Sequence, residues 1–160
     1  MPDDVSHHPY VSRESWSDNP FLRSQGLELE EVATGHVVLH LRDPRPEQRG
    51  AGGSPLAINS GLISYMFDGS LGWAIVSAQL PRLQAAGVDV ARYTQVTMNL
   101  DVTFLEAAMG NRFESHGRVV RVGKGSAFAE GELRDENGRV CATAKGIWRI
   151  FWPPALKQPG

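Results

Sequence analysis

The carboxylate of Asp68 is the first candidate for chemistry, because it lies near the middle of a helix-length apolar segment, residues 59–79. Burying an ionised carboxylate is costly unless the group is paired, hydrogen-bonded or protonated. A buried aspartate therefore tends to have a raised pKa, and such groups are concentrated at functional sites. Two interpretations are open for Asp68: a reactive group, or a structural carboxylate bonded to a neighbouring backbone group or hydroxyl.

Other side chains of reactive types have a weaker context. The serines of the apolar segment lack the strand-to-helix turn that holds the nucleophile of Ser-His-Asp hydrolases. Cys141, the single cysteine, lies among small apolar residues and is expected to be a packed, inert thiol. His7 and His8 have no partners at ligand spacing, so no metal site is expected. Structural or exposed roles are favoured for the three histidines in strand patterns: His36, His40 and His116.

A helix is expected to position Asp68. Asn59 and Ser60 are good N-cap residues, and the next proline is Pro81, so the helix should begin near Asn59 and end near Gln79. Its apolar residues surround the axis instead of forming one stripe, which is typical of a helix buried on nearly all sides. The glycines that follow the acid leave room for another group to approach closely.

Strands are expected on both sides of this helix. Residues 27–33 and 36–42 alternate well enough to form a hairpin, with Thr34-Gly35 as its turn, and residues 43–55 should be a loop. Residues 82–90 should be a short helix or an irregular connection. Four alternating segments then predict a meander: 96–104, 112–122, 126–134 and 139–151. Two strands, one buried helix and four antiparallel strands make an α+β architecture.

Composition sets the broad class. The 160 residues fit a single domain at 19–152, between a loose leader (1–18) and a short C-terminal tail (153–160). The net charge of −2 gives no sign of a nucleic-acid partner, although eight of the sixteen basic residues lie between Arg112 and Arg149. No segment fits a membrane span, and the acidic N-terminus does not fit a signal peptide. A cytoplasmic location is the expectation.

These features together resemble the hot-dog-fold acyl-CoA thioesterases of the phenylacetate-pathway (PaaI-like) type. In that family a turn leads into a buried helix, with an acid nine residues after the first residue of the turn. Asn59-Ser60-Gly61 occupies the turn here, and Asp68 is the acid. The segment Thr97–Ala108 matches the family's polar-then-aromatic strand, and the segment Gly131–Gly146 matches its final hairpin. The resemblance covers roughly residues 19–151.

The resemblance implies a hydrolase that cleaves an acyl-CoA thioester to a free acid and coenzyme A, with no separate cofactor. Asp68 matches the acid that attacks the carbonyl or activates a water. The backbone N–H of Ser60 matches the oxyanion donor, aided by the helix macrodipole. Thr97 matches a hydroxyl residue that holds the water or the acid, and the family's shared active site implies that it faces the Asp68 of a partner subunit.

Three further expectations follow. The resemblance implies a homodimer or a dimer of dimers (a homotetramer). The local positive charge of the second half of the chain favours coenzyme A phosphates there, near the basic residues Arg118, Arg121 and Lys124 and the adjoining turn residue Gly125. The turn departs from the family, because Asn59 replaces a histidine, Ser60 a glycine and Gly53 an amide residue. A non-catalytic hot-dog module that binds acyl-CoA is therefore the alternative function.

Overall fold

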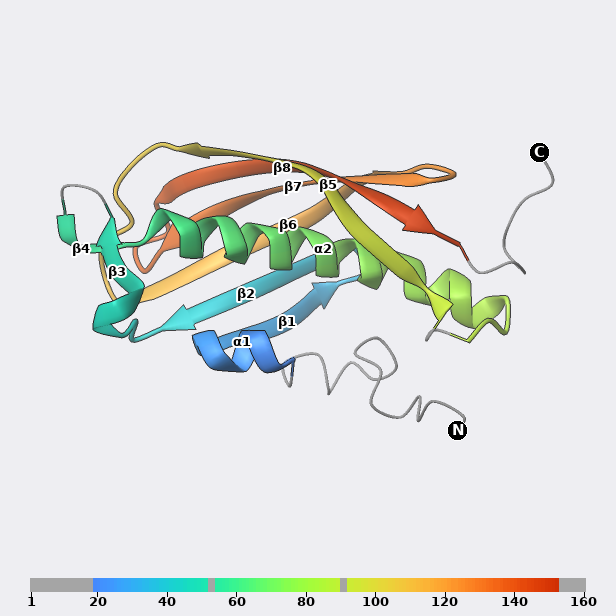
Figure 1. Cartoon of the computed structure of the whole chain (residues 1–160), viewed down its shortest axis with the longest axis horizontal. Helices are drawn as coiled ribbons and strands as arrows, with labels where there is room; N and C mark the ends of the chain where they lie inside the picture. Colours follow the sequence, from blue (N-terminus) through green and yellow to red (C-terminus); the bar gives the residue numbers. More distant parts are fainter. Residues whose placement is uncertain (1–18, 52–53, 90–91, 153–160) are drawn as a thin grey trace.

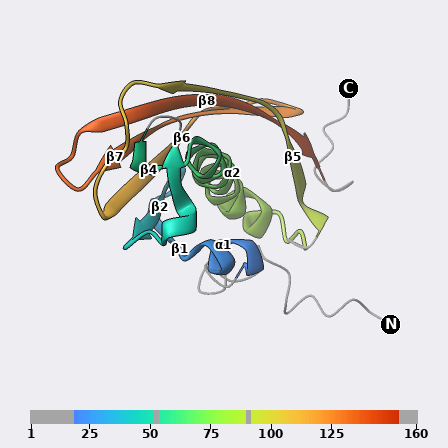
Figure 2. The same cartoon turned by 60° about the vertical axis from the view of Figure 1, so that its left-hand side comes forward.

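One long helix forms the centre of the protein in a computed structural model that describes residues 19–51, 54–89 and 92–152 (Figure 1). The helix, α2 (Ser60–Ala85), is wrapped by a six-stranded antiparallel sheet in the order β1-β2-β6-β7-β8-β5. Figure 2 shows this sheet curving round α2, with β1 and β5 at its two ends. The strands are β1 (Leu27–Ala33), β2 (His36–Arg42), β5 (Thr94–Phe104), β6 (Arg112–Val122), β7 (Ser126–Asp135) and β8 (Val140–Phe151). The predicted α+β hot-dog fold is confirmed.

The first hairpin forms as the alternation predicts. Strands β1 and β2 have the expected bounds, and Gly35 in the turn between them adopts a positive φ of 78°. Its N–H donates to Ser77 Oγ at 2.8 Å, which attaches the turn to α2. Leu39 and Leu41 of β2 are buried in the core between sheet and helix.

The prediction of a plain loop at 43–55 is wrong. This segment contains a 3-10 turn, η3 (Pro46–Gln48), and a small ribbon of β3 (Arg49–Ala51) and β4 (Ser54–Ile58). The buried side chain of Gln48 explains why this segment is structured. Its Nε2 donates to Gln25 O at 2.7 Å, and Gln25 is the last residue of the short helix α1 (Pro20–Gln25). The N–H of Asn59 donates to Gln48 O at 2.9 Å. The ribbon thereby fixes the entry into α2.

Helix α2 continues past the predicted end near Gln79, through Pro81, to Ala85. A proline inside a helix removes one backbone hydrogen bond and strains the preceding turn. Leu80 and Leu83 are buried on either side of it and hold the last turns against the core. The guanidinium of Arg82 also lies 4.6 Å from the centre of the Trp152 ring. Tertiary packing therefore outweighs the local penalty.

Glycines in the sheet let α2 approach closely. A Cβ at Gly117 of β6 would lie 2.3 Å from the backbone oxygen of Ser70, far inside van der Waals contact. The buried hydroxyls of Ser70 and Ser115 are 2.9 Å apart beside this contact and form a hydrogen bond. Residues 70–77 of α2 are buried on all sides, as predicted, whereas Tyr65, Asp68 and Gly69 are only partly covered.

Of the four later strands, β6, β7 and β8 form the predicted meander, whereas β5 does not pair with β6. Strand β5 pairs with β8 at the edge of the sheet, and β6 pairs with β2. Residues 105–111 cross the end of the sheet, where the N–H groups of Leu105 and Glu106 donate to Cys141 O at 2.9 and 3.1 Å. Alternation marks a strand but not its neighbour, so this crossing was not visible in the sequence.

Strand β5 has a bulge in its middle. Its register with β8 shifts between Thr97 and Asn99, so Met98 is the extra residue. Val96 and Met98, two apolar residues of the alternating segment, keep 47% and 61% of their surface exposed. Leu100 and Val102, beyond the bulge, pack against the core. The outer edge of β5 has no neighbouring strand among the described residues.

Two further expectations concern the ends of the chain and a membrane span. The predicted leader (1–18) and tail (153–160) fall outside the described residues. Within the described ranges, no helix combines the length and the apolar character that crossing a membrane requires.

Candidate active site

Asp68 and Thr97 meet through a short hydrogen bond. Thr97 Oγ1 donates to Asp68 Oδ1 at 2.6 Å. Asp68 comes from the open side of α2, and Thr97 comes from the face of β5 that is turned toward the helix. The expectation that Thr97 faces the Asp68 of a partner subunit is wrong, because this bond lies within one chain. The inward-curving edge of the sheet brings β5 back over its own helix (Figure 2).

The Asn59-Ser60-Gly61 turn forms the N-terminus of α2. The Asn59 side chain caps the helix, since its Oδ1 accepts from Gly61 N at 2.8 Å. Gly61 therefore supports the cap and its N–H is not free for a ligand. Ser60 is the first helical residue, and its N–H has no acceptor among the described residues. This group remains available as a donor at the positive end of the helix dipole.

The donor and the acid lie apart within one chain. Ser60 precedes Asp68 by eight residues, which is about 12 Å along a helix. The two residues line different hollows. Ser60 borders one of 360 Å³ with Ile63, Phe104 and Ala108, whereas Asp68 borders another of 210 Å³. A single thioester carbonyl cannot contact both groups in an isolated chain.

The cavity at Asp68 extends along α2 toward its C-terminal half. It is lined by Asn19, Tyr65, Asp68, Gly69, Gly72, Trp73, Val76, Gln95, Thr97 and Trp148. Burial and the negative charge of Asp68 raise the pKa of Tyr65 to about 12, so this phenol stays protonated at neutral pH. The cavity therefore combines one carboxylate with neutral polar groups and aromatic walls.

Gln95 is a polar lining residue that sequence reasoning missed. Its Nε2 donates to Gly72 O at 2.8 Å, and its Oε1 accepts from Tyr93 Oη at 2.6 Å. The available signal was its position two residues before Thr97, on the same face of one strand. Trp73 and Trp148 line the same cavity.

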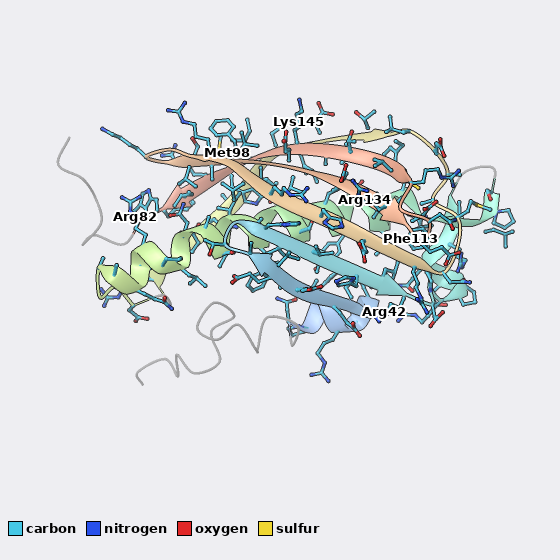
Figure 3. The ribbon with its side chains drawn as sticks, turned by 180° about the vertical axis from the view of Figure 1, so that it is seen from behind. Arg42, Arg82, Met98, Phe113, Arg134 and Lys145 are labelled. Carbon is cyan, nitrogen blue, oxygen red and sulfur yellow. The ribbon has the colours of Figure 1, made fainter. Side chains whose placement is uncertain are left out.

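The predicted coenzyme A residues lie away from Asp68. Arg118 is on the outer face of β6, opposite Glu130 of β7. Arg121 and Lys124 are exposed at the end of the β6–β7 hairpin, and Gly125 O accepts from Ile150 N at 3.0 Å. Figure 3 views the sheet from behind, with the outer side of β2 and β6 toward the reader. These four residues gather neither at Asp68 nor at the Ser60 turn of the same chain.

The histidines lie on this outer face, away from the cavity. His36 Nε2 and His116 Nδ1 are 3.2 Å apart, and Glu114 is bonded to His116 Nε2 at 3.1 Å. His40 pairs with Glu30 at 2.7 Å. Within the described part of the chain, no three His, Cys, Asp or Glu side chains are arranged to hold a metal ion. Cys141 is buried, as expected.

Comparison with known proteins identifies the family to which the chain is similar. The model of the thioesterase superfamily matches residues 59–142, a range that contains the turn, Asp68 and Thr97. The medium/long-chain acyl-CoA thioesterase YigI of Salmonella typhimurium is 28% identical over 134 residues, which cover 82% of this chain and 85% of that protein. YigI of Escherichia coli K12 is 26% identical over the same length and coverage.

Solved structures share the fold. A thioesterase family protein from Silicibacter pomeroyi superposes with a TM-score of 0.72 at 21% identity, over 92% of this chain and 99% of that one. The PaaI protein of E. coli, from the phenylacetic acid degradation operon, superposes with a TM-score of 0.71 at 13% identity, over 92% and 96%. At these identities the likeness concerns the arrangement of helix and sheet.

Proposed function

Because the chain belongs to the thioesterase superfamily, we propose that it is an enzyme that hydrolyses acyl-CoA thioesters to a free acid and coenzyme A. The observation that carries the proposal is the Asp68–Thr97 pair at the mouth of a cavity. A carboxylate held by a hydroxyl beside a partly apolar cavity is suited to attack on a bound acyl group. The YigI relatives support medium- or long-chain acyl groups as substrates.

Asp68 acts as the base or the nucleophile. Thr97 occupies Oδ1, which orients the carboxylate and leaves Oδ2 to take a proton from water or to attack the carbonyl carbon. The Ser60 N–H stabilises the negative charge that develops on the thioester oxygen. The spacing of Asn59, Asp68 and Thr97 supports a mechanism of the phenylacetate-pathway type.

A second copy of the chain completes the site. The separation of Ser60 from Asp68 within one chain supports an oxyanion donor that comes from another subunit. The unpaired edge of β5, with Val96 and Met98 exposed, is suited to joining two sheets into one. We therefore propose a homodimer, or a dimer of dimers, in which each site combines Asp68 and Thr97 of one subunit with the Ser60 turn of the other.

The phosphates of coenzyme A contact the basic hairpin in this proposal. Arg121 and Lys124 are exposed and lie in the region of positive charge excess, with Arg118 and Gly125 close in sequence. Arg49 is a poorer candidate, because its guanidinium already donates to Leu56 O and Asn111 Oδ1. Replacing Arg121 and Lys124 together by Ala should raise KM for acyl-CoA and leave kcat nearly unchanged. An unchanged KM would exclude this hairpin.

Thiol release from butanoyl-, octanoyl- and palmitoyl-CoA tests the activity. The proposal expects turnover of at least the longer two. The alternative, a non-catalytic module that binds acyl-CoA, predicts binding without thiol release. Calorimetry with the same three compounds distinguishes a module that binds acyl-CoA from a protein that neither binds nor hydrolyses it.

A further inference from the structure

The cavity at Asp68 contains two nitrogen donors that lie close to one point. That point is where a side chain at Gly72 would begin. A Cβ there would lie 3.5 Å from Trp148 Nε1 and 3.6 Å from Gln95 Nε2. All three residues line the cavity, so a ligand atom near this point contacts both nitrogens.

Both donors have a hydrogen to spare. The Gln95 amide is oriented by its bonds to Gly72 O and Tyr93 Oη, which use one of the two hydrogens on Nε2. The indole N–H of Trp148 is a pure donor, and no described residue accepts from it.

The direction of the Trp148 ring is fixed by another glycine. A Cβ at Gly146 would lie 2.4 Å from Trp148 Cζ3, so only glycine leaves space for the six-membered ring. With that ring over Gly146, the nitrogen side of the indole is turned toward Gly72. The two donors are therefore held in place before any ligand binds.

The charge of the site selects the type of acceptor. Asp68 lines the same cavity, and the lining residues include no lysine or arginine. A second carboxylate in the ligand would be repelled by Asp68 and have no cation to pair with. A neutral oxygen, in a hydroxyl or a carbonyl group, accepts from both nitrogens without that cost.

The donors lie close to Asp68 and Thr97, where the proposed reaction takes place. Gly72 follows Asp68 by four residues, about one helical turn or 6 Å. Gln95 precedes Thr97 by two residues, about 7 Å along β5. Since an oxygen on the third carbon of an acyl chain lies roughly 4 Å from the thioester carbon, it is within reach of these donors.

We propose that the cavity selects acyl groups with a neutral oxygen on or near their third carbon, through the Trp148 indole and the Gln95 amide that converge beside Gly72. This inference rests on the proposed thioesterase function and narrows its substrates. Trp148 and Gln95 thereby determine specificity, whereas Asp68 and Thr97 serve the chemistry.

The test compares octanoyl-CoA with its 3-hydroxy and 3-oxo derivatives, which have the same chain length. Wild-type kcat/KM should be about tenfold or more higher for at least one oxygenated substrate, because one or two additional hydrogen bonds form. The two oxygenated arms distinguish a hydroxyl from a carbonyl. Trp148→Phe removes one donor and should lower the preference about fivefold.

Two further variants control for folding and packing. Gly72→Ala places a methyl group at the convergence point at ordinary contact distances and should bring the preference close to one. Trp73→Phe changes the same type of side chain in the same cavity and should leave the preference as in the wild type. Gly72→Ala decides the question if Trp148→Phe does not fold.

The outcomes separate the two proposals. If the wild type hydrolyses none of the three substrates, the thioesterase function is wrong, and the specificity proposal falls with it. If it hydrolyses all three equally, the function stands and the selection is wrong, because the two donors then bind only water. A preference that survives both Trp148→Phe and Gly72→Ala also overturns the selection.

Discussion

The pairing of Asp68 with Thr97 gives the two carboxylate oxygens different tasks. One oxygen is bonded at 2.6 Å and the other remains for the substrate. The sequence identified both residues through their spacing from the turn. It could not identify which chain supplies Thr97, because a motif on a strand does not say over which helix the strand closes.

Asp68→Asn should lower kcat on octanoyl-CoA by about a hundredfold or more, because the amide is neither a base nor a nucleophile. The steady-state rate of thiol release measures this loss. An unchanged melting temperature would establish that the fold is intact. Wild-type turnover by the variant would mean that Asp68 has only a structural role.

Substitutions at Ser60 test the oxyanion donor. Ser60→Gly and Ser60→Ala keep the N–H and should retain most activity, whereas Ser60→Pro should lose roughly 3 kcal/mol of transition-state stabilisation. Proline fits this site, since Ser60 is the first helical residue and Asn59 has an extended ψ of 132°. Comparable kcat/KM for all three variants would show that another group holds the oxyanion.

At the scale of helices and strands, the local features of α2 and the sheet could be predicted from the sequence, and the long-range ones could not. The first hairpin and the start of α2 were predictable, because alternation and the Asn59 cap are local signals. The passage of α2 through Pro81 and the pairing of β5 with β8 were not. Both depend on contacts between residues far apart in the chain, such as Leu83 with the core.

Gly117→Ala should destabilise the protein by about 2 kcal/mol, because the new methyl group overlaps the Ser70 carbonyl on α2. Urea unfolding followed by circular dichroism measures the change. Gly125→Ala is the matched control, since a Cβ at Gly125 meets nothing within 4 Å. Equal stability of the two variants would mean that α2 can shift away from β6 at little cost.

Titration of His36, on the outer face of the sheet, should make the free energy of unfolding depend on pH. Burial, followed by the charges of Arg118 and His116, lowers the pKa of His36. The folded protein therefore binds this proton less readily than the unfolded chain. Stability from His36 is complete above its ordinary pKa of about 6.5 and is lost as the pH falls through the lowered value.

Urea unfolding at neutral pH and at roughly pH 5 measures this loss, which His36→Asn should reduce. His36 lies away from the cavity, so the His36→Asn substitution changes stability without altering the candidate active site. An identical pH dependence in wild type and variant would assign the acid sensitivity to other groups.

For the whole molecule, the separation of acid and donor makes assembly a condition of activity. Asp68→Asn and Ser60→Pro impair different halves of the shared site. Mixing the two inactive proteins under subunit exchange should restore about a quarter of wild-type activity, since half of the dimers are mixed and each has one intact site.

Asp68→Asn mixed with Thr97→Val is the control for this experiment. Both residues belong to the same half of the site, so no mixed dimer gains an intact combination of acid and hydroxyl. Restored activity in this mixture would mean that Thr97 acts with the Asp68 of the partner subunit. A monomer that hydrolyses acyl-CoA, by light scattering at the assay concentration, would rule out a shared site altogether.

The bulge at Met98 sets the phase of β5 on either side of it. Before the bulge, the inward positions are Gln95 and Thr97, and after it they are Leu100 and Val102. Strict alternation from Thr97 would instead turn Asn99 and Asp101 inward. Deleting Met98 would leave Thr97, Asn99 and Leu100 in strict alternation with the same side chains inward. The extra residue therefore bends the strand beside the site without changing which side chains face α2.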